Sequence, residues 1–449
     1  MNRSEALILE GGRVYLEGEF REKDLFLLNG LVYTEAPAYE GEWKKLDCQG
    51  LHLFPGFVDL HVHFREPGQE YKETIETGSL AAAHGGYTTV CTMPNLRPVP
   101  DSLAALKVQL DLIKEKAHVH VLPYGAITRG EKGESLSDFE AMAPYVVAFT
   151  DDGVGVDREE TMEEAMVRAK ALGKAIVAHA EDISLVQGGV IHDGDYAKAH
   201  GHKGNPSASE YTQVRRDVAL AEKTGVHYHV CHVSSKESVA AIRAAQDKGA
   251  RVSFETAPHY LTLTDDDLQE DGRFKMNPPI RAKADQAALR QAMVEGALSA
   301  IATDHAPHSA EEKAGGLDHS LNGIVGLETA FPVCYTDLVK GGVTDLETLV
   351  RLLTTEPTKT LDLHKIRDAH FSLAPALGIQ NGDPADLTLF DLEASYTIDP
   401  EDFLSKGKAS PFTGKKVYGR CLATWVAGEA AYWDEKNLKE RELDHDGTI

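Results

Sequence analysis

Between residues 53 and 308 the chain alternates between strand-like and helix-like segments, and this alternation constrains the fold more than any other feature. Strands that alternate with helices indicate parallel strands joined by crossover helices. The eight strand-like segments span residues 53–63, 86–95, 118–127, 146–152, 174–180, 227–234, 251–259 and 299–308. Eight such repeats predict an α/β fold with a (β/α)₈ TIM-like barrel.

An open, doubly wound sheet is the alternative architecture for alternating strands and helices. That fold commonly carries a glycine-rich phosphate-binding turn after its first strand. Here the first strand runs instead into Asp-Leu-His-Val-His-Phe-Arg, at residues 59–65. The sequence therefore favours the barrel.

The two ends of the chain read differently from the middle. Short apolar alternations broken by Gly, Asn and Glu fill residues 5–54 and recur in residues 372–433, which is typical of small antiparallel strands. Neither piece is long enough to form a good core alone. We therefore predict one composite β-sandwich domain from residues 1–54 and 369–449, and a catalytic barrel from residues 55–368.

Bulk composition excludes several classes of partner. The formal net charge of −25 argues against nucleic acid and against an anionic membrane, because both require a basic surface. The five cysteines show no C-x-x-C pairing, which indicates free thiols in a reducing compartment. Without a signal-like segment or an apolar run of about 18 residues, we expect a cytoplasmic protein.

The first predicted barrel strand ends in three residues that can carry chemistry. His61, His63 and Arg65 lie at alternate positions, so their side chains leave the strand on one face. Two imidazoles on one face form half of a zinc site. An arginine beside them can hold an anionic group of a substrate in a bidentate manner.

Ligand-type residues also end most of the other predicted strands. In a barrel the carboxyl ends of the strands meet at one mouth, where chemistry occurs. These residues are Asn95 after the second strand, Asp151 and Asp152 after the fourth, His179 after the fifth, His232 after the sixth, and Asp304 and His308 after the eighth.

Four histidines and two aspartates exceed the needs of one tetrahedral Zn²⁺, and they suit two metals bridged by a carboxylate. We assign His61, His63 and Asp304 to the first ion, and His179 and His232 to the second. An aspartate after the fourth strand bridges the two ions. From the residues alone, Asp151 and Asp152 compete for that position.

Other residues at these strands have structural interpretations. His118 and His120 open the third strand, at the wrong end of a barrel for chemistry. His227 and His229 lie too deep in the sixth strand to reach its mouth. Cys231 neighbours His232, and strict alternation turns its side chain towards the helices.

Taken together, the motifs of the chain resemble bacterial type I dihydroorotase, a family of the amidohydrolase superfamily, over about residues 5–430. The matching motifs are His61-Val-His63-Phe-Arg65-Glu-Pro-Gly, Met93-Pro94-Asn95, Thr150-Asp-Asp-Gly153, Val230-Cys-His232-Val-Ser234, Lys275-Met-Asn277-Pro-Pro and Thr303-Asp304-His-Ala-Pro-His308. The resemblance implies reversible cyclisation of N-carbamoyl-L-aspartate to L-dihydroorotate, the third step of pyrimidine synthesis. Many superfamily members bridge their metals with a modified lysine, whereas this family uses the second aspartate of Thr-Asp-Asp-Gly, which selects Asp152.

The resemblance also implies roles for further residues and partners. Asp304 is the general acid and base, and His63 contacts both metal and substrate. The other substrate-binding residues are Arg65, Asn95 and His308 at the carboxylate, Asn277 at the ring amide, and Asn322 and Gly323, where family members often have Pro-Phe-Gly. Residues 309–321 read as a mobile lid. The implied cofactor is Zn²⁺, as one or two ions with two favoured. A homodimer and an association with aspartate carbamoyltransferase stay open.

Two rival functions remain at this point. Hydantoinases, dihydropyrimidinases and allantoinases act on rings without the carboxylate, so they have no need of Arg65. An inactive homologue that serves only as a partner of the transferase typically loses metal ligands, but here every ligand position is filled.

Overall fold

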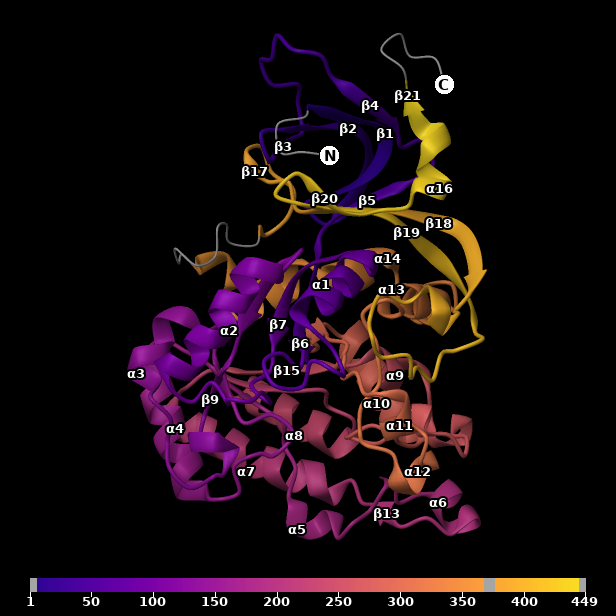
Figure 1. The fold of residues 1–449 in the computed structure, drawn as a ribbon. Coiled ribbons are helices and arrows are strands. Elements are labelled where there is room, and N and C mark those ends of the chain that lie inside the picture. The colour runs from indigo at the N-terminus through magenta and orange to yellow at the C-terminus, as the bar shows by residue number, and fades with distance from the viewer. Residues whose placement is uncertain (1–5, 367–375, 444–449) are drawn as a thin grey trace.

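The computed structural model describes residues 6–366 and 376–443, which form a barrel with helices around it and a β-sandwich packed on one side (Figure 1). The first and last described strands, β1 (Leu7–Leu16) and β21 (Glu442–Leu443), both lie in the sandwich. The prediction of a TIM-like barrel with a sandwich built from both chain ends is confirmed.

The barrel is a closed ring of parallel strands. In order of pairing they are β6 (Phe57–Val62), β7 (Tyr87–Thr92), β8 (His120–Pro123) with its continuation β9 (Gly125–Ala126), β10 (Phe149–Thr150), β11 (Ile176–Ala178), β14 (Tyr228–Val230), β15 (Val252–Thr256) and β16 (Ala300–Ile301). The third strand pairs with β7 before Tyr124 and with β10 after it. A parallel bridge between Val62 and His305 closes the ring.

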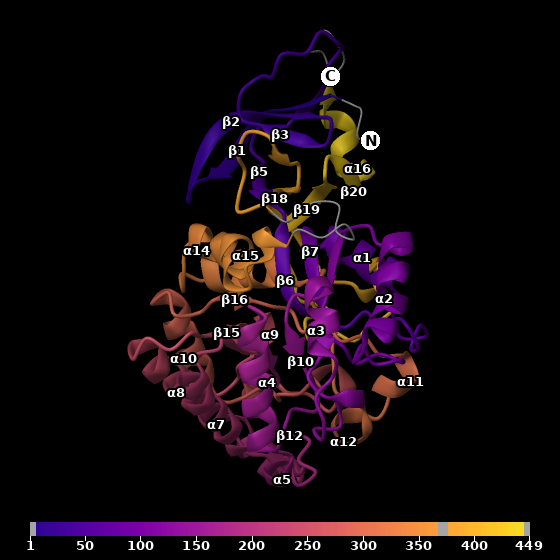
Figure 2. The same ribbon diagram turned by 90° about the vertical axis from the view of Figure 1, so that its left-hand side faces the viewer.

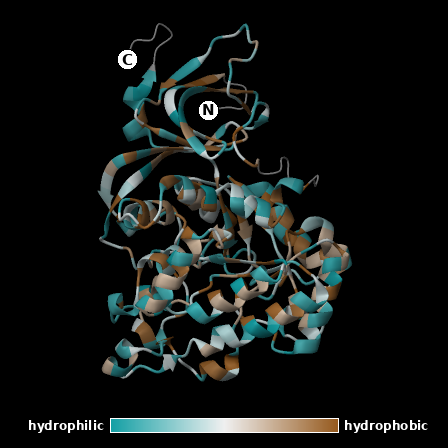
Figure 3. Ribbon diagram, turned by 180° about the vertical axis from the view of Figure 1, so that it is seen from behind, coloured by the Kyte–Doolittle hydropathy of each residue, from teal (hydrophilic) through white to brown (hydrophobic). Residues whose placement is uncertain are grey.

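Amphipathic helices cover the outside of the ring (Figure 2). They include α2 (Leu103–Lys116), α4 (Glu159–Ala171), α7 (Ala208–Thr224), α8 (Lys236–Asp247) and α10 (Lys283–Val294). Both hydrophilic and hydrophobic residues occur along these outer helices (Figure 3), as expected for elements with one buried face. No helix in the described part of the chain is long and apolar enough to cross a membrane.

Two barrel strands are much shorter than the sequence predicts. Only residues 300–301 pair as a strand within the predicted 299–308, and only residues 149–150 pair within 146–152. The chain leaves the extended conformation at Asp304, whose φ of 49° lies in the left-handed region. The residues beyond it therefore form a loop at the mouth.

The sandwich is a ten-stranded sheet whose strands come from both ends of the chain. Besides β1 and β21 they are β2 (Glu19–Leu28), β3 (Leu31–Tyr33), β4 (Lys44–Asp47), β5 (His52–Pro55), β17 (Asp383–Pro384), β18 (Leu387–Thr397), β19 (Lys416–Val426) and β20 (Glu429–Trp433). The expectation of purely antiparallel strands was wrong, because β1 pairs in parallel with β4 and β5. The long connections between these strands permit parallel pairing, which two-residue hairpins do not.

Aromatic side chains join the sandwich to the barrel. Phe54 of β5 stacks on Phe57 of β6, with ring centroids 5.8 Å apart. Phe331 of α13 (Ala330–Cys334) and Phe390 of β18 lie 4.5 Å apart in the same cluster. The proposed domain boundary at residues 54 and 55 falls within the last two residues of β5, and the boundary at 368 and 369 lies outside the described residues. The division into domains thus stays a prediction.

Candidate active site at the mouth of the barrel

The end of β6 carries the first two histidines into the barrel. Asp59, which is fully buried, accepts hydrogen bonds from the backbone N–H of His61 at 3.0 Å and of Thr303 at 3.1 Å. This carboxylate ties the end of β6 to the segment that carries Asp304. His61 and His63 both lie buried at the mouth as a result.

The first group of candidate ligands contains His61, His63 and Asp304. The Oδ1 atom of Asp304 lies 3.5 Å from Nε2 of His61 and 3.3 Å from Nε2 of His63. The ligand atoms of the three residues lie within 4.8 Å of one another, close enough to surround one ion.

The second group forms around Asp152. Its Oδ1 atom lies 3.3 Å from Nε2 of His61, 3.7 Å from Nε2 of His232 and 4.0 Å from Nδ1 of His179. Its Oδ2 atom lies 3.4 Å from Nε2 of His63. The structure thus places this carboxylate between the two sets of imidazoles.

Asp151 occupies a different environment. Its Oδ1 atom accepts hydrogen bonds from the backbone N–H of Ile127 at 2.7 Å and of Thr128 at 3.0 Å. Through these hydrogen bonds the carboxylate of Asp151 holds the segment that directly follows β9. Burial raises the pKa of Asp151 to about 6, in part offset by these hydrogen bonds.

The donor atoms of the cluster suit a metal such as zinc. Nε2 of His61 and Oδ1 of Asp152 are buried, and neither has a hydrogen-bond partner among the residues that the structure describes. Nδ1 of His179 and Nε2 of His232 lie only 3.0 Å apart. A buried polar atom without a partner costs about 1–3 kcal/mol, a cost that a bound cation removes. Imidazole and carboxylate are the ligands of zinc sites.

The pKa of Asp304 favours the ionised form that a metal requires. Burial by itself raises this pKa, but the hydrogen bond to His63 and the nearby imidazoles His61 and His232 hold it below its usual value. The side chain is therefore a carboxylate at neutral pH.

A pocket of about 220 Å³ opens onto this cluster. Its lining contains most of the site residues predicted from sequence: His63, Arg65, Asn95, Asp152, His179, His232, Asn277, Asp304, Asn322 and Gly323. Gly153 and Ala306 complete the lining, whereas the predicted residues His61 and His308 lie outside it. Drug-sized ligands occupy about 300–1,000 Å³, so this volume suits a small ring.

Cationic side chains gather on one side of the pocket. Nε of Arg65 donates to the carbonyl of Pro307 at 3.3 Å, and its guanidinium lies 3.5 Å from Nε2 of His308. The ammonium of Lys72 lies 3.3 Å from Nδ1 of His308. Sequence reasoning missed Lys72, because only the packing of its loop brings it here.

Asn277 and His179 share a carboxylate that sequence reasoning also missed. Glu181 accepts a hydrogen bond from Nδ2 of Asn277 at 3.0 Å, and the same oxygen lies 3.6 Å from Nε2 of His179. The available signal was its position two residues after His179, which places both side chains beyond the end of β11.

The expectation that Cys231 faces the helices was wrong. Its thiol lies with His61 and Glu255 inside the barrel. On β14, Tyr228 points outwards and donates to Asp217 of α7, so alternation places Cys231 inside. His232 also stays inside because its φ of 31° breaks the alternation.

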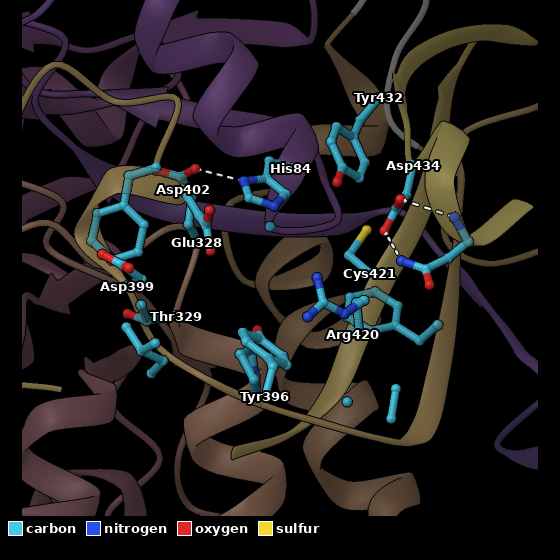
Figure 4. Close-up of a pocket in the computed structure, with 18 of the residues that line it drawn as sticks. His84, Glu328, Thr329, Tyr396, Asp399, Asp402, Arg420, Cys421, Tyr432 and Asp434 are labelled. Atoms are coloured by element: carbon cyan, nitrogen blue, oxygen red, sulfur yellow. Dashed lines mark hydrogen bonds and ion pairs between the residues drawn. The ribbon is translucent and has the colours of Figure 1, made fainter. Parts of the chain in front are cut away.

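A larger cavity lies elsewhere, between the barrel and the sandwich (Figure 4). It measures about 580 Å³ and is lined by residues such as Tyr396, Arg420 and Tyr432. The carboxylate of Glu328 in its wall already has partners. Its Oε1 atom lies 2.6 Å from Nδ1 of His84 and accepts a hydrogen bond from the backbone N–H of Leu404. None of the candidate metal-ligand groups found among the described residues lies in this cavity.

An eight-stranded barrel whose mouth gathers four imidazoles and two carboxylates defines a metal-dependent hydrolase. A family model described as Dihydro-orotase-like matches residues 50–238. The dihydroorotase of Shouchella clausii is 49% identical over 97% of this chain and 100% of that protein. The dihydroorotase of Listeria innocua is 48% identical over 96% of this chain and 99% of that protein.

Solved structures show the same architecture. The L-hydantoinase of Arthrobacter aurescens matches with a TM-score of 0.81 at 25% identity, over 95% of this chain and 96% of that one. The dihydropyrimidinase of Brevibacillus agri matches with a TM-score of 0.79 at 22% identity, over 98% and 97% of the two chains. Because sequence identity is about twice as high with the curated relatives, these structures report the fold. The chain belongs to the dihydroorotase family.

The two neighbouring aspartates give a matched pair of variants. We expect Asp152→Asn to lose bound metal, because the neutral amide can no longer link the two groups of imidazoles. We expect Asp151→Asn to keep its metal and to lower only the thermal stability. Elemental analysis after gel filtration measures the metal, and equal metal content in both variants would contradict the assignment of Asp152.

Proposed function

We propose that this chain catalyses the reversible cyclisation of N-carbamoyl-L-aspartate to L-dihydroorotate in pyrimidine synthesis. The observation that carries the proposal is one small pocket lined both by residues of the metal-ligand cluster and by Arg65 and Asn95, with His308 in contact with the guanidinium of Arg65. A hydrolysable ring amide with a carboxylate beside it requires both features. The dihydroorotases that are 48–49% identical to the chain support the same reaction.

We propose zinc as the metal, with two ions in the site. The first ion is assigned to His61, His63 and Asp304, and the second to His179 and His232, with Asp152 between them. Bound zinc lowers the pKa of water from 15.7 to about 7 and polarises the carbonyl that is attacked. Two groups of candidate ligands share His61, one with His63 and Asp304 and one with Asp152 and His232, and they support two ions over one.

Asp304 is the residue that moves the proton. In the hydrolytic direction its carboxylate takes a proton from the attacking water while oxygen bonds to the ring carbonyl carbon. When the C–N bond of the ring amide breaks, the same carboxyl group delivers that proton to the leaving nitrogen. In the cyclising direction the steps run in reverse, and Asp304 removes the proton from the carbamoyl nitrogen.

The remaining pocket residues hold the ring. We propose that Arg65, Asn95 and His308 bind the carboxylate, that Asn277 contacts the ring amide, and that Asn322 and Gly323 contact the ring through their backbone. Asn95 lines the same pocket as Arg65, and its Nδ2 group carries the N–H donors from which a carboxylate accepts. A homodimer, an association with aspartate carbamoyltransferase and a cytoplasmic location are proposed on the family resemblance alone.

A ring-opening assay tests the substrate. Zinc-loaded protein is expected to open L-dihydroorotate and to leave dihydrouracil and hydantoin intact, because the uncharged rings have no partner for Arg65. The zinc content is measured on the same sample. Turnover of the uncharged rings instead would keep the barrel and its metals but replace the proposed activity with that of a hydantoinase.

Arg65→Lys is expected to lower kcat/KM for L-dihydroorotate about 10- to 100-fold with the zinc content unchanged. A lysine offers a point charge where the guanidinium offers a planar fork, and a lost charge-assisted hydrogen bond costs about 1.5–3 kcal/mol. Arg168→Lys on the outer face of α4 is the matched control. Full activity of Arg65→Lys would refute the assignment of the carboxylate site.

Asp304→Asn is expected to lower kcat by about 10²–10⁴-fold, because the amide cannot accept and return a proton. Since Asp304 is also a proposed ligand, kcat is measured at saturating zinc and divided by the fraction of zinc-loaded protein. If the zinc-loaded variant turned over at the wild-type rate, Asp304 would have no acid–base role.

A further inference from the structure

A continuous chain of hydrogen bonds descends from the candidate metal site through the interior of the barrel. Nδ1 of His61 lies 3.1 Å from Oε1 of Glu255, and Nε2 of His229 lies 3.1 Å from Oε2 of the same carboxylate. Nδ1 of His229 lies 2.8 Å from Oγ of Ser253, which lies 2.7 Å from Nε2 of His227. His229 of β14 and His227, which directly precedes that strand, both belong to this chain of hydrogen bonds, and neither is assigned to the metal site.

The positions of the protons in this chain follow from the chemistry of its members. A carboxylate only accepts, so both His61 Nδ1–H and His229 Nε2–H donate to Glu255. A neutral His229 then accepts at Nδ1 from the hydroxyl of Ser253. That hydroxyl oxygen in turn accepts from Nε2–H of His227. Every bond thus has one donor and one acceptor, and a neutral His61, the form that binds a metal, then carries no proton on Nε2.

The unprotonated nitrogen of His61 is the one that faces the ligand cluster. Nε2 of His61 lies towards Asp152 and Asp304, and it has no hydrogen-bond partner in the described part of the chain. The opposite nitrogen is held by Glu255. The carboxylate therefore selects the tautomer that can bind a metal.

Burial of Glu255 is costly without a nearby cation. Its side chain is 0% exposed, and within residues 6–366 and 376–443 its ion-pair partners are the two imidazoles. A buried carboxylate that is only hydrogen-bonded to neutral groups carries a large desolvation cost. A divalent cation held by His61 would supply the compensating charge.

We propose that Glu255 is a positioning residue for the metal site, which fixes the ring and tautomer of His61 and which the bound metal in turn stabilises. His229, Ser253 and His227 hold the carboxylate in place from below. The proposal rests on the proposed metal site, and it is independent of the proposed substrate.

The test compares zinc retention with stability in Glu255→Gln. Glutamine has the same shape, but it carries no charge and its amide group opposes one of the two N–H donors. Zinc-loaded protein is mixed with a coloured chelator, and the thermal midpoint is measured with and without zinc. We expect zinc to be released about 10- to 100-fold faster. We also expect zinc to raise the thermal midpoint of the variant less than that of the wild type.

Asp217→Asn is the matched control, since Asp217 is also fully buried and accepts hydrogen bonds from Tyr228 at 3.0 Å and Arg216 at 2.8 Å. It is expected to lower the midpoints of the zinc-loaded and zinc-free forms equally, with wild-type zinc release. Equal lowering of both midpoints by Glu255→Gln, or zinc release at the wild-type rate, would reduce Glu255 to a structural residue and overturn the proposal.

If Glu255→Gln does not fold, Ser253→Ala tests the same chain of hydrogen bonds. This variant keeps the charge of Glu255 and removes the hydroxyl group that bonds to Nδ1 of His229. Faster zinc release than in Asp217→Asn supports the proposal, and release at the rate of that control overturns it. The zinc-release and melting measurements use no substrate. A wild-type protein that binds zinc but opens no L-dihydroorotate would therefore refute only the proposed substrate. A wild-type protein that binds no zinc overturns both proposals.

Discussion

Closure of the parallel barrel is the constraint on which the site depends. When Val62 pairs with His305, the first and last strands become neighbours, and the carboxyl ends of all the strands face one mouth. His61 and Asp304 are more than 240 residues apart in the chain, yet closure brings their ligand atoms to 3.5 Å. Two carboxylates are buried together there, and several donor atoms of the cluster lack hydrogen-bond partners among the described residues, so the energy of packing the barrel holds together a cluster that would not form alone.

The alternation of strands and helices carries enough information to predict the barrel, and the strand ends carry enough to predict the ligand residues. The alternation does not predict where the backbone changes its conformation at the mouth of the barrel. His232 and Asp304 have positive φ values, so the simple alternation of side chains ends there. This is why both Cys231 and His232 lie inside the barrel, which strict alternation does not allow.

Loop residues that contact the site residues from outside the pocket were the hardest to predict. Lys72 lies in the loop after β6, and Glu181 follows β11; neither belongs to a repeating pattern. Their positions depend on contacts between loops, which have no period in the sequence. The parallel pairing of β1 with β5 escaped prediction for a similar reason, because the length of a connection permits several pairings.

The interior of this barrel also departs from the usual filling of barrels with branched apolar side chains. Glu255, His229 and Ser253 occupy interior positions that valine or isoleucine could fill at a lower cost in desolvation. Replacing a buried polar network with apolar residues often leaves a protein as stable or more so. Stability alone therefore does not account for this network. What an apolar core could not do is hold the ring of His61 in one orientation with one nitrogen free, and a metal ligand must have both properties before the ion binds.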